Sequence, residues 1–379
     1  MPRRLIDVRP AAERALLLGA PRKRSADAAA SQEHLDELAR LADTAGAVVV
    51  GRMSQFVVAP TPDFYIGRGK VEEVAARLAE LSASLLIMDE ELSPTQGKHL
   101  EDALKVRVMD RAELILDIFA LRARSREART QVELAQLEYL LPRLTRMWVH
   151  LSRIRGGIGL RGPGETQLET DRRMIRQKIG ALKVKLGEIG EHRRRLQGRT
   201  AGRGVTKVAL VGYTNAGKSS LLRALTGAAA HVEDRLFATL DTASREVVLG
   251  GRTFRFTDTV GFIRKLPHDL VASFRSTLEE ADQADVLLHV VDVAHHDWLE
   301  QARVVSETLA GAGLERHPVV MVLNKADRLD QADRDRRLAE AQALGFPAVL
   351  VSATTGLGRE ELVQAIAGHP VSGEPRNRG

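Results

Sequence analysis

One stretch in the middle of the chain has the residue types and spacing of a phosphate-binding loop. Residues 212–219 read G-x-x-x-x-G-K-S and come directly after the apolar run at 208–211. The pattern predicts a buried strand, then a turn that glycine permits, then a helix that starts near Ser219. The free backbone N–H groups at the start of that helix point toward an anion. In that geometry Lys218 reaches the β- and γ-phosphates of a nucleotide, and the Ser219 hydroxyl coordinates Mg²⁺. We therefore predict nucleotide contacts from Gly212, Tyr213, Thr214, Asn215, Ala216, Gly217, Lys218, Ser219 and Ser220.

Two later segments offer further groups for the metal ion and the γ-phosphate. Thr239, in the segment 236–242, could supply a second Mg²⁺ ligand. The predicted strand at 253–257 leads into Asp258 and Gly261. The aspartate can hold the magnesium shell, and the glycine lets a backbone N–H approach the γ-phosphate. The second segment is therefore a predicted switch that senses whether this phosphate is present.

Two segments near the C-terminus predict a choice of base. Asn324, Lys325 and Asp327 follow the apolar strand at 319–323. A carboxylate can accept two hydrogen bonds from the N1–H and N2–H₂ edge of guanine, a donor pair that adenine lacks, so Asp327 should select GTP. We expect Asn324 to brace two loops and the Lys325 stem to cover the base. Ser352, Ala353 and Thr354 end the strand at 348–351, where the Ala353 N–H can meet guanine O6.

Basic charge is concentrated before the nucleotide motifs. Residues 126–203 contain 18 Lys and Arg against 8 Asp and Glu, a balance of +10 in a chain whose net charge is +6. Within them, Arg153, Arg155 and Arg161 lie among five glycines between two helical patterns, at 112–141 and 167–196. A flexible basic tip on a two-helix arm predicts RNA binding. The alternatives are a solvated, salt-bridged helix surface and an ordinary long turn.

Composition indicates a globular protein of the reducing cytoplasm. The chain has 379 residues and no cysteine, which excludes disulfides and thiolate metal sites. No stretch has the length of a transmembrane helix and no signal peptide precedes the first domain, so we expect a soluble cytoplasmic protein, as a monomer.

The first 111 residues alternate short apolar runs with helical patterns, as in a small α/β domain. We predict strands at 15–18, 48–50, 85–88 and 106–109, and helices at 32–42, 70–81 and 95–104, the last started by Ser93 and Pro94. Gly67 and Gly69 could form a second anion-binding turn, although glycines that simply permit a turn are the preferred interpretation. Asp89, Glu90 and Glu91 could bind a cation, although a solvated loop is preferred.

Taken together, these motifs resemble the HflX family of GTPases over about residues 5–367. The nucleotide motifs are shared by translation-type GTPases, whereas the segments 67–73, 131–137 and 156–169 are typical of HflX proteins. The resemblance implies an N-terminal α/β domain at 1–111, an antiparallel helical hairpin at 112–203, and a P-loop GTPase domain at 204–368. That last domain has a doubly wound, mostly parallel sheet. For residues 369–379 we predict a disordered tail, because they are rich in Pro, Gly and Arg.

The resemblance also implies roles for particular residues. Thr239 falls on the magnesium-binding threonine, and Thr242 stands where the family has proline. Lys218, Thr239 and Gly261 take catalytic roles, and Ser219, Thr239 and Asp258 bind Mg²⁺. Further contacts with GTP or GDP come from Phe237, Ala238, Leu240, Asp258, Thr259, Val260, Gly261, Asn324, Lys325, Asp327, Ser352, Ala353 and Thr354.

The resemblance implies a GTP hydrolase that binds the large (50S) ribosomal subunit and its rRNA and separates stalled or idle ribosomes under stress. Phe262 occupies the position where many GTPases have the glutamine that orients the attacking water. We therefore expect slow hydrolysis by the free protein and stimulation by the ribosome. Two alternatives stay open: a GTPase of large-subunit assembly, and a GTP-gated RNA-binding module in which hydrolysis is incidental.

Overall fold

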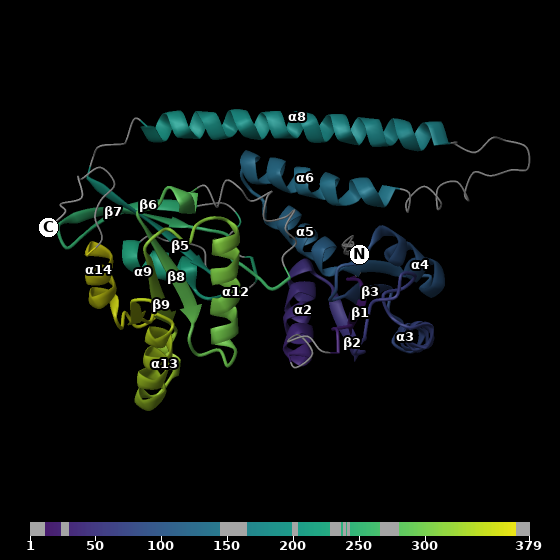
Figure 1. Ribbon diagram of the computed structural model, residues 1–379, viewed down its shortest axis with the longest axis horizontal. Coiled ribbons are helices and arrows are strands. Elements are labelled where there is room, and N and C mark those ends of the chain that lie inside the picture. The colour runs from purple at the N-terminus through teal and green to yellow at the C-terminus, as the bar shows by residue number, and fades with distance from the viewer. Residues whose placement is uncertain are drawn as a thin grey trace, which may run out of the picture. The chain divides into compact units, whose positions relative to one another are not determined.

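The computed structural model describes residues 12–23, 30–144, 165–198, 204–227, 236–237, 240, 243–265 and 280–368. They belong to two compact units (Figure 1). The first unit is 1–121 with 136–177, and the second is 122–135 with 178–379. Arg153, Arg155, Arg161, Ala238, Thr239 and the predicted tail lie outside the described residues. The domain boundaries proposed above stay a prediction.

The first unit contains a four-stranded parallel sheet with the order β2-β1-β3-β4. Its strands are β1 (Arg14–Gly19), β2 (Val48–Ser54), β3 (Leu85–Met88) and β4 (Arg107–Asp110), and its first helices are α2 (Ser31–Ala45), α3 (Arg68–Glu80) and α4 (Pro94–Leu104). Helix α2 packs on β1 and β2, while apolar residues of α3 and α4 share a core with β1, β3 and β4. The predicted strands and helices are confirmed.

Local capping explains where two of these helices begin. Ser93 is the N-cap of α4, and its hydroxyl accepts a hydrogen bond from the Gln96 N–H at 3.2 Å. The Gln96 side chain in turn accepts from the Ser93 N–H at 2.9 Å, which completes a capping box before Pro94. Gly67 is the N-cap of α3, with an extended backbone (φ −73°) that any residue can adopt, so the interpretation that this glycine permits a turn stays a prediction.

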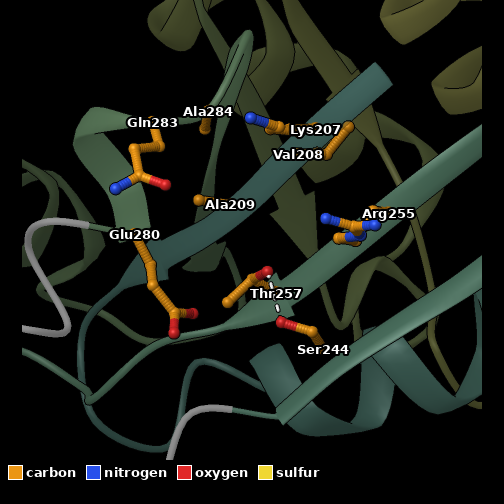
Figure 2. A pocket seen from close by; sticks show the side chains of 9 residues that line it. All are labelled: Lys207, Val208, Ala209, Ser244, Arg255, Thr257, Glu280, Gln283 and Ala284. Carbon is orange, nitrogen blue, oxygen red and sulfur yellow. Dashed lines mark hydrogen bonds between the residues drawn. The ribbon is translucent and has the colours of Figure 1, made fainter. Parts of the chain in front are cut away.

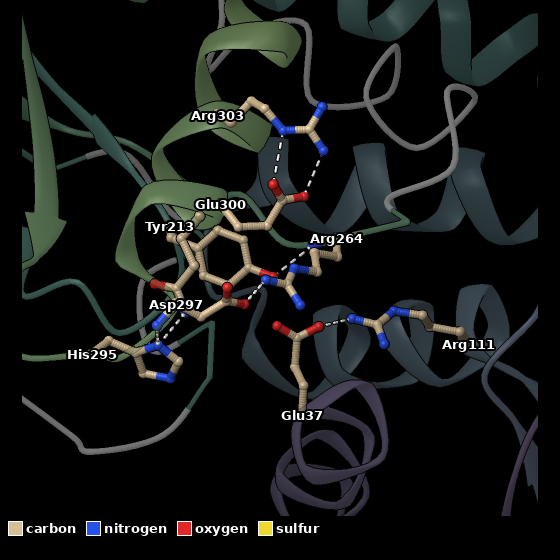
Figure 3. A network of polar contacts seen from close by, with 9 residues as sticks. Glu37, Arg111, Tyr213, Arg264, His295, Asp297, Glu300 and Arg303 are labelled. Atoms are coloured by element: carbon tan, nitrogen blue, oxygen red, sulfur yellow. Dashed lines mark hydrogen bonds and ion pairs between the residues drawn. The ribbon is translucent and has the colours of Figure 1, made fainter. Parts of the chain in front are cut away.

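The acidic cluster after β3 is buried, so the expected solvated loop is wrong for Asp89 and Glu90. The Arg111 guanidinium donates to Asp89 Oδ1 at 2.7 Å and also pairs with Glu37 (Figure 3). Glu90 Oε2 accepts a hydrogen bond from the Ala20 N–H at 2.7 Å. The sequence did not indicate this burial, because the arginine that pairs with Asp89 lies 22 residues later, directly after the next strand, β4.

The long helical pattern at 112–141 forms two helices, so the prediction of one continuous helix is wrong. Helix α5 (Arg111–Arg122) ends before Ala123, and α6 (Arg126–Leu140) begins after Ser125. The Ser125 hydroxyl accepts a hydrogen bond from the Ala128 N–H at 3.0 Å, as an N-cap does. A 3₁₀ helix, η1 (Leu141–Arg143), follows α6 and contains Pro142, which ends the helix as predicted.

The second predicted arm helix is α8 (Glu165–Gly198), close to the expected 167–196. Ile179 and Leu182 of this helix are buried, whereas Met174 and Val184 are exposed. Lys178 on α8 pairs with Glu133 on α6 at 2.6 Å, which joins the two helices within the second unit.

The second unit contains a six-stranded sheet with the order β10-β9-β8-β5-β7-β6. Its strands are β5 (Val205–Gly212), β6 (Ala243–Leu249), β7 (Arg252–Asp258), β8 (Val286–Asp292), β9 (Val319–Asn324) and β10 (Ala348–Leu350). Its helices are α9 (Lys218–Thr226), α12 (Trp298–Gly311), the 3₁₀ helix η2 (Ala326–Arg328), α13 (Gln331–Ala343) and α14 (Arg359–Ala367). Apolar residues of α9 and α14 pack in one core with the sheet, and those of α12 and α13 pack in another (Figure 1).

Strand β6 was missed, and it is antiparallel to β7. The two strands are joined through Gly250 and Gly251, whose φ angles are 56° and 77°. Two consecutive positive φ angles match the tight hairpin turn that glycine pairs favour. The Gly-Gly pair was therefore the available signal for the hairpin. The other five strands are parallel, so the predicted doubly wound, mostly parallel sheet is confirmed.

Candidate nucleotide-binding site

The predicted phosphate loop connects β5 to the N-terminus of α9. A Cβ atom at Gly212 would overlap the Val290 carbonyl oxygen, and one at Gly217 would overlap the Asn324 amide. Gly217 also has a φ angle of 93°, which L side chains rarely adopt. The two glycines thus let the loop run directly against β8 and the end of β9. The α9 N–H groups that follow are placed to meet phosphate oxygens.

Lys218 lies at the centre of this loop with its ammonium buried. Nζ donates to the Gly212 carbonyl at 3.1 Å and to the Tyr213 carbonyl at 3.0 Å. Burial lowers the pKa of Lys218 to about 8, and nearby Asp258 opposes that shift. A phosphate group would compensate the buried charge, because the first partners are backbone carbonyls and the side chain is only 6% exposed.

Two of the three predicted metal ligands are in direct contact. The Ser219 hydroxyl donates to Asp258 Oδ2 at 2.5 Å. Ser219 begins α9 and Asp258 ends β7, a strand that pairs directly with β5. An alcohol and a carboxylate oxygen are donors that Mg²⁺ accepts, so this pair fits the ion. The third predicted ligand, Thr239, lies outside the described residues.

The neighbours of Thr239 that the structure describes are buried. Leu236 and Leu240 are each 5% exposed and Phe237 is 2% exposed. Apolar side chains on both sides of the threonine thus enter the core of the second unit.

The predicted guanine motif is held against the phosphate loop. The Asn324 amide donates to the Ala216 carbonyl at 2.9 Å, and its Oδ1 accepts from the Ala353 N–H at 3.2 Å. Asn324 therefore links the phosphate loop to the loop after β10. Because Ala353 already donates to Asn324, the expected contact of its N–H with guanine O6 stays a prediction.

Asp327 lies on η2 with its side chain exposed. Among the described residues, its carboxylate makes no hydrogen bond or ion pair, so it is available to a base. Ser352 is buried, and its hydroxyl accepts from the Thr354 and Thr355 N–H groups at 3.3 and 3.1 Å. The hydroxyl thereby shapes the loop that carries Ala353.

One residue of the site was missed by the sequence analysis. Asp292, at the end of β8, accepts a hydrogen bond from Lys325 Nζ at 2.7 Å. The same ammonium donates to the Asn215 carbonyl at 2.9 Å. Asp292 therefore orients Lys325 toward the phosphate loop. Its position at the carboxyl end of a buried strand, one place along the sheet from Asn324, was the signal that could have identified it.

The start of the predicted second switch is paired with β5, the strand that leads into the phosphate loop. The Thr259 hydroxyl donates to the Leu210 carbonyl at 2.6 Å. The Phe262 side chain is 7% exposed, so the ring lies in the protein interior. A buried ring cannot orient a water molecule, which agrees with the expectation drawn from the residue type.

A separate hollow of about 220 Å³ lies on the face of the sheet beside β5 and β7 (Figure 2). Lys207, Arg255 and Glu280 contribute to its lining, and a 2.8 Å hydrogen bond joins the hydroxyls of Ser244 and Thr257. None of its lining residues was predicted to contact the nucleotide.

Within the described part of the chain, no group of three or more His, Cys, Asp or Glu side chains is arranged to hold a metal ion. Among the helices described, none is long and apolar enough to cross a bilayer.

Three protein families match successive parts of the chain. They are described as GTP-binding GTPase N-terminal, over residues 32–120, GTP-binding GTPase Middle Region, over 122–200, and 50S ribosome-binding GTPase, over 207–325. The match thus extends over the α/β segment, the arm and the nucleotide motifs up to Lys325.

Similar proteins cover most of the chain. The protein named GTPase HflX from Caldanaerobacter subterraneus subsp. tengcongensis is 50% identical over 336 residues, 88% of this chain and 76% of that protein. GTPase HflX from Escherichia coli is 43% identical over 344 residues, 90% of this chain and 80% of its own length. The crystal structure of SsGBP in complex with GDP aligns with a TM-score of 0.53 at 26% identity, covering 94% of this chain and 97% of that one.

Proposed function

The chain belongs to the HflX family of GTPases and is a GTP hydrolase, and we propose that it acts on ribosomes. In this proposal it binds the large subunit and dissociates stalled or idle ribosomes under stress, and the ribosome stimulates hydrolysis. We propose that the protein acts in the cytoplasm, because its proposed partner is the ribosome.

The observation that carries the proposal is the uneven charge. The segment 126–203 has 18 Lys and Arg against 8 Asp and Glu, although the whole chain has a net charge of only +6. Neutralisation of phosphates is the main sequence-independent contribution to nucleic-acid binding. The description of the matching family, 50S ribosome-binding GTPase, supports rRNA as the polyanion. We assign this contact to Arg153, Arg155 and Arg161.

The site supports a specific division of labour for hydrolysis. Lys218 and the α9 N–H groups hold the β- and γ-phosphates, and Asp327 selects guanine, with Asn324 and Lys325 bracing the base loop. Ser219, Asp258 and Thr239 would hold Mg²⁺, which neutralises developing charge on the phosphates when it is bound. Gly261 presents its N–H to the γ-phosphate.

The presence of phenylalanine at position 262 supports the proposal that GTP hydrolysis depends on the ribosome. The side chain that usually orients the attacking water is replaced by a buried ring. We therefore expect slow turnover by the free protein. Ribosomal contact would order the switches or supply the missing group, as partner proteins do for other GTPases.

The test measures GTP hydrolysis by the purified protein, alone and with purified large ribosomal subunits. The Arg153/Arg155/Arg161→Ala variant is compared with Arg77/Arg303/Arg336→Ala, which removes the same charge from exposed side chains elsewhere. We expect strong stimulation that only the first variant loses. Equal loss in both variants would attribute the effect to net charge.

The absence of any stimulation would contradict the proposal. Sucrose-gradient profiles then separate the remaining possibilities. Binding only to immature large subunits, with intact ribosomes left unchanged, would indicate an assembly GTPase. Full activity of a hydrolysis-deficient variant would indicate an RNA-binding module gated by GTP.

A further inference from the structure

The first residues of the predicted second switch form a short parallel bridge with the phosphate loop. The Phe262 N–H donates to the Gly212 carbonyl at 3.0 Å, and the Thr214 N–H donates to the Phe262 carbonyl at 2.7 Å. The bridge involves backbone atoms only, so it forms whatever the side chain at 262. Other contacts must therefore determine how firmly this segment is held.

Arg264 makes those contacts with its backbone and its side chain (Figure 3). Its N–H donates to the hydroxyl of Tyr213 at 2.9 Å, and its guanidinium forms an ion pair with Asp297. Arg264 is only 8% exposed, so the pair is shielded from solvent on the arginine side. Tyr213 belongs to the phosphate loop and Asp297 to the turn before α12. The arginine therefore connects the switch to two parts of the nucleotide fold.

The turn that carries Asp297 is itself ordered. The Asp297 N–H donates to His295 Nδ1 at 3.1 Å, and the same nitrogen lies 3.3 Å from the Gln301 amide nitrogen on α12. Trp298, the next residue, is fully buried. Asp297 is thus fixed to the body of the second unit, and the ion pair transmits that fixed position to Arg264.

The residue that this arrangement positions is Gly261. A Cβ atom on Gly261 would lie 2.9 Å from the Thr214 Cα and 3.0 Å from Lys218 Nζ. The glycine therefore lies directly against the lysine that reaches the β- and γ-phosphates. Arg264 follows Gly261 by three residues, on the far side of the backbone bridge at Phe262.

We propose that Tyr213, Arg264 and Asp297 are positioning residues that hold the Gly261 N–H ready for the γ-phosphate. They thereby determine how strongly the protein prefers GTP to GDP. The proposal rests on the proposed contact of Gly261 with that phosphate and is independent of any ribosomal role. GDP has no γ-phosphate, so we expect its affinity to depend on Lys218, the backbone of the phosphate loop and the guanine motif, and not on the Tyr213 hydroxyl or the Arg264–Asp297 pair.

The test uses the full chain without ribosomes and measures affinity for a non-hydrolysable GTP analogue and for GDP. Tyr213→Phe removes only the hydroxyl, and Asp297→Asn removes only the charge. Each should weaken binding of the analogue about 5–10-fold, as expected for loss of one buried polar contact, while GDP affinity changes by less than about twofold. The maximal hydrolysis rate should fall in the same variants.

Two further variants make the result decisive. Glu307→Gln disrupts the exposed pair between Glu307 and Arg303 on α12 and should leave both affinities unchanged. Asp297→Glu, which keeps the charge, should recover part of the preference for the analogue. Equal weakening of the analogue and GDP would show a merely structural role and overturn the proposal. Unchanged affinities for both nucleotides would overturn it as well.

Discussion

The carboxyl ends of the two parallel sheets carry buried charges that are neutralised in opposite ways. In the first unit, Arg111 pairs with Asp89 and Glu37. In the second unit, the buried Lys218 ammonium donates to two backbone carbonyls. At one edge a buried arginine has two carboxylate partners, whereas the other edge has a buried cation whose pKa is lowered to about 8, chiefly by burial.

This difference shows why the carboxyl edge of a sheet is not by itself a ligand site. Strand topology gathers polar side chains at that edge in both units. A ligand is favoured only where a buried charge gains a better partner by binding it than it has in the free protein. The predictions below test this contrast, from the largest expected effect to the smallest.

Replacement of the buried lysine should abolish function while the fold is kept. In Lys218→Met we expect GTP hydrolysis to fall at least about 100-fold, because the group that stabilises charge on the phosphates is lost. The free energy of unfolding should stay the same or rise, because the variant no longer buries an ammonium among carbonyls. Hydrolysis assays and urea unfolding check both effects, with Lys207→Met, on the strand β5 that precedes the phosphate loop, as control. A marked loss of stability would contradict this account.

Replacement of the buried Arg111 should lower stability and leave GTP hydrolysis unchanged. In Arg111→Met, two buried carboxylates lose their shared cation, so we expect the unfolding free energy of the first unit to fall by about 3–5 kcal/mol. GTP hydrolysis by the protein alone should be unaffected at a temperature where both units are folded. Circular dichroism during denaturation measures the change. Arg107→Met, which removes an exposed arginine of β4, should cost under about 1 kcal/mol. Equal costs for the two variants would contradict the expected burial effect.

The exposed carboxylate of Asp327 tests recognition at the same edge of the second unit. Asp327→Asn should weaken GTP binding about 10–100-fold and favour xanthine nucleotides, because the amide can donate to the extra carbonyl of xanthine. Competition binding with both nucleotides measures the change in preference. Asp335→Asn, on the exposed side of α13, is the matched control. If competition by xanthine nucleotides did not change, Asp327 would not be the base-selecting residue.

The smallest expected effect is a pH dependence of nucleotide affinity. Burial lowers the pKa of Lys218 to about 8 in the free protein, and phosphates favour the charged ammonium, so the pKa rises on binding. GTP affinity should therefore be constant below about pH 8 and fall by up to about tenfold per unit above it. Burial, and then the charge of Lys218, lower the pKa of His289 to about 4, so this residue stays neutral throughout. Calorimetry in buffers of different ionisation enthalpy should detect proton uptake. Affinity that is flat up to about pH 9 would contradict the assignment.

Much of the fold followed from patterns within single segments. Apolar runs of strand length, the Ser93-Pro94 helix start and the spacing from Gly212 to Ser219 each reflect the conformation of a few consecutive residues. The local signals that were overlooked, Ser125 as an N-cap and Gly250-Gly251 as a hairpin turn, were of the same kind. The Ser125 signal was masked by the longer helical pattern at 112–141. The Gly250-Gly251 signal was masked by the stronger nucleotide motif that precedes it.

The order of motifs along the chain determined the candidate site and the family of this protein, because phosphate and guanine recognition depend on short stretches with defined spacing. Only the tertiary structure decided which side chains neutralise one another. Asp292 with Lys325, Arg264 with Asp297, and Arg111 with Glu37 are each separated by more than 30 residues in the sequence. Such pairs form because the sheets bring distant strand ends together, and the free energy of a buried charge depends on the partner that it meets there.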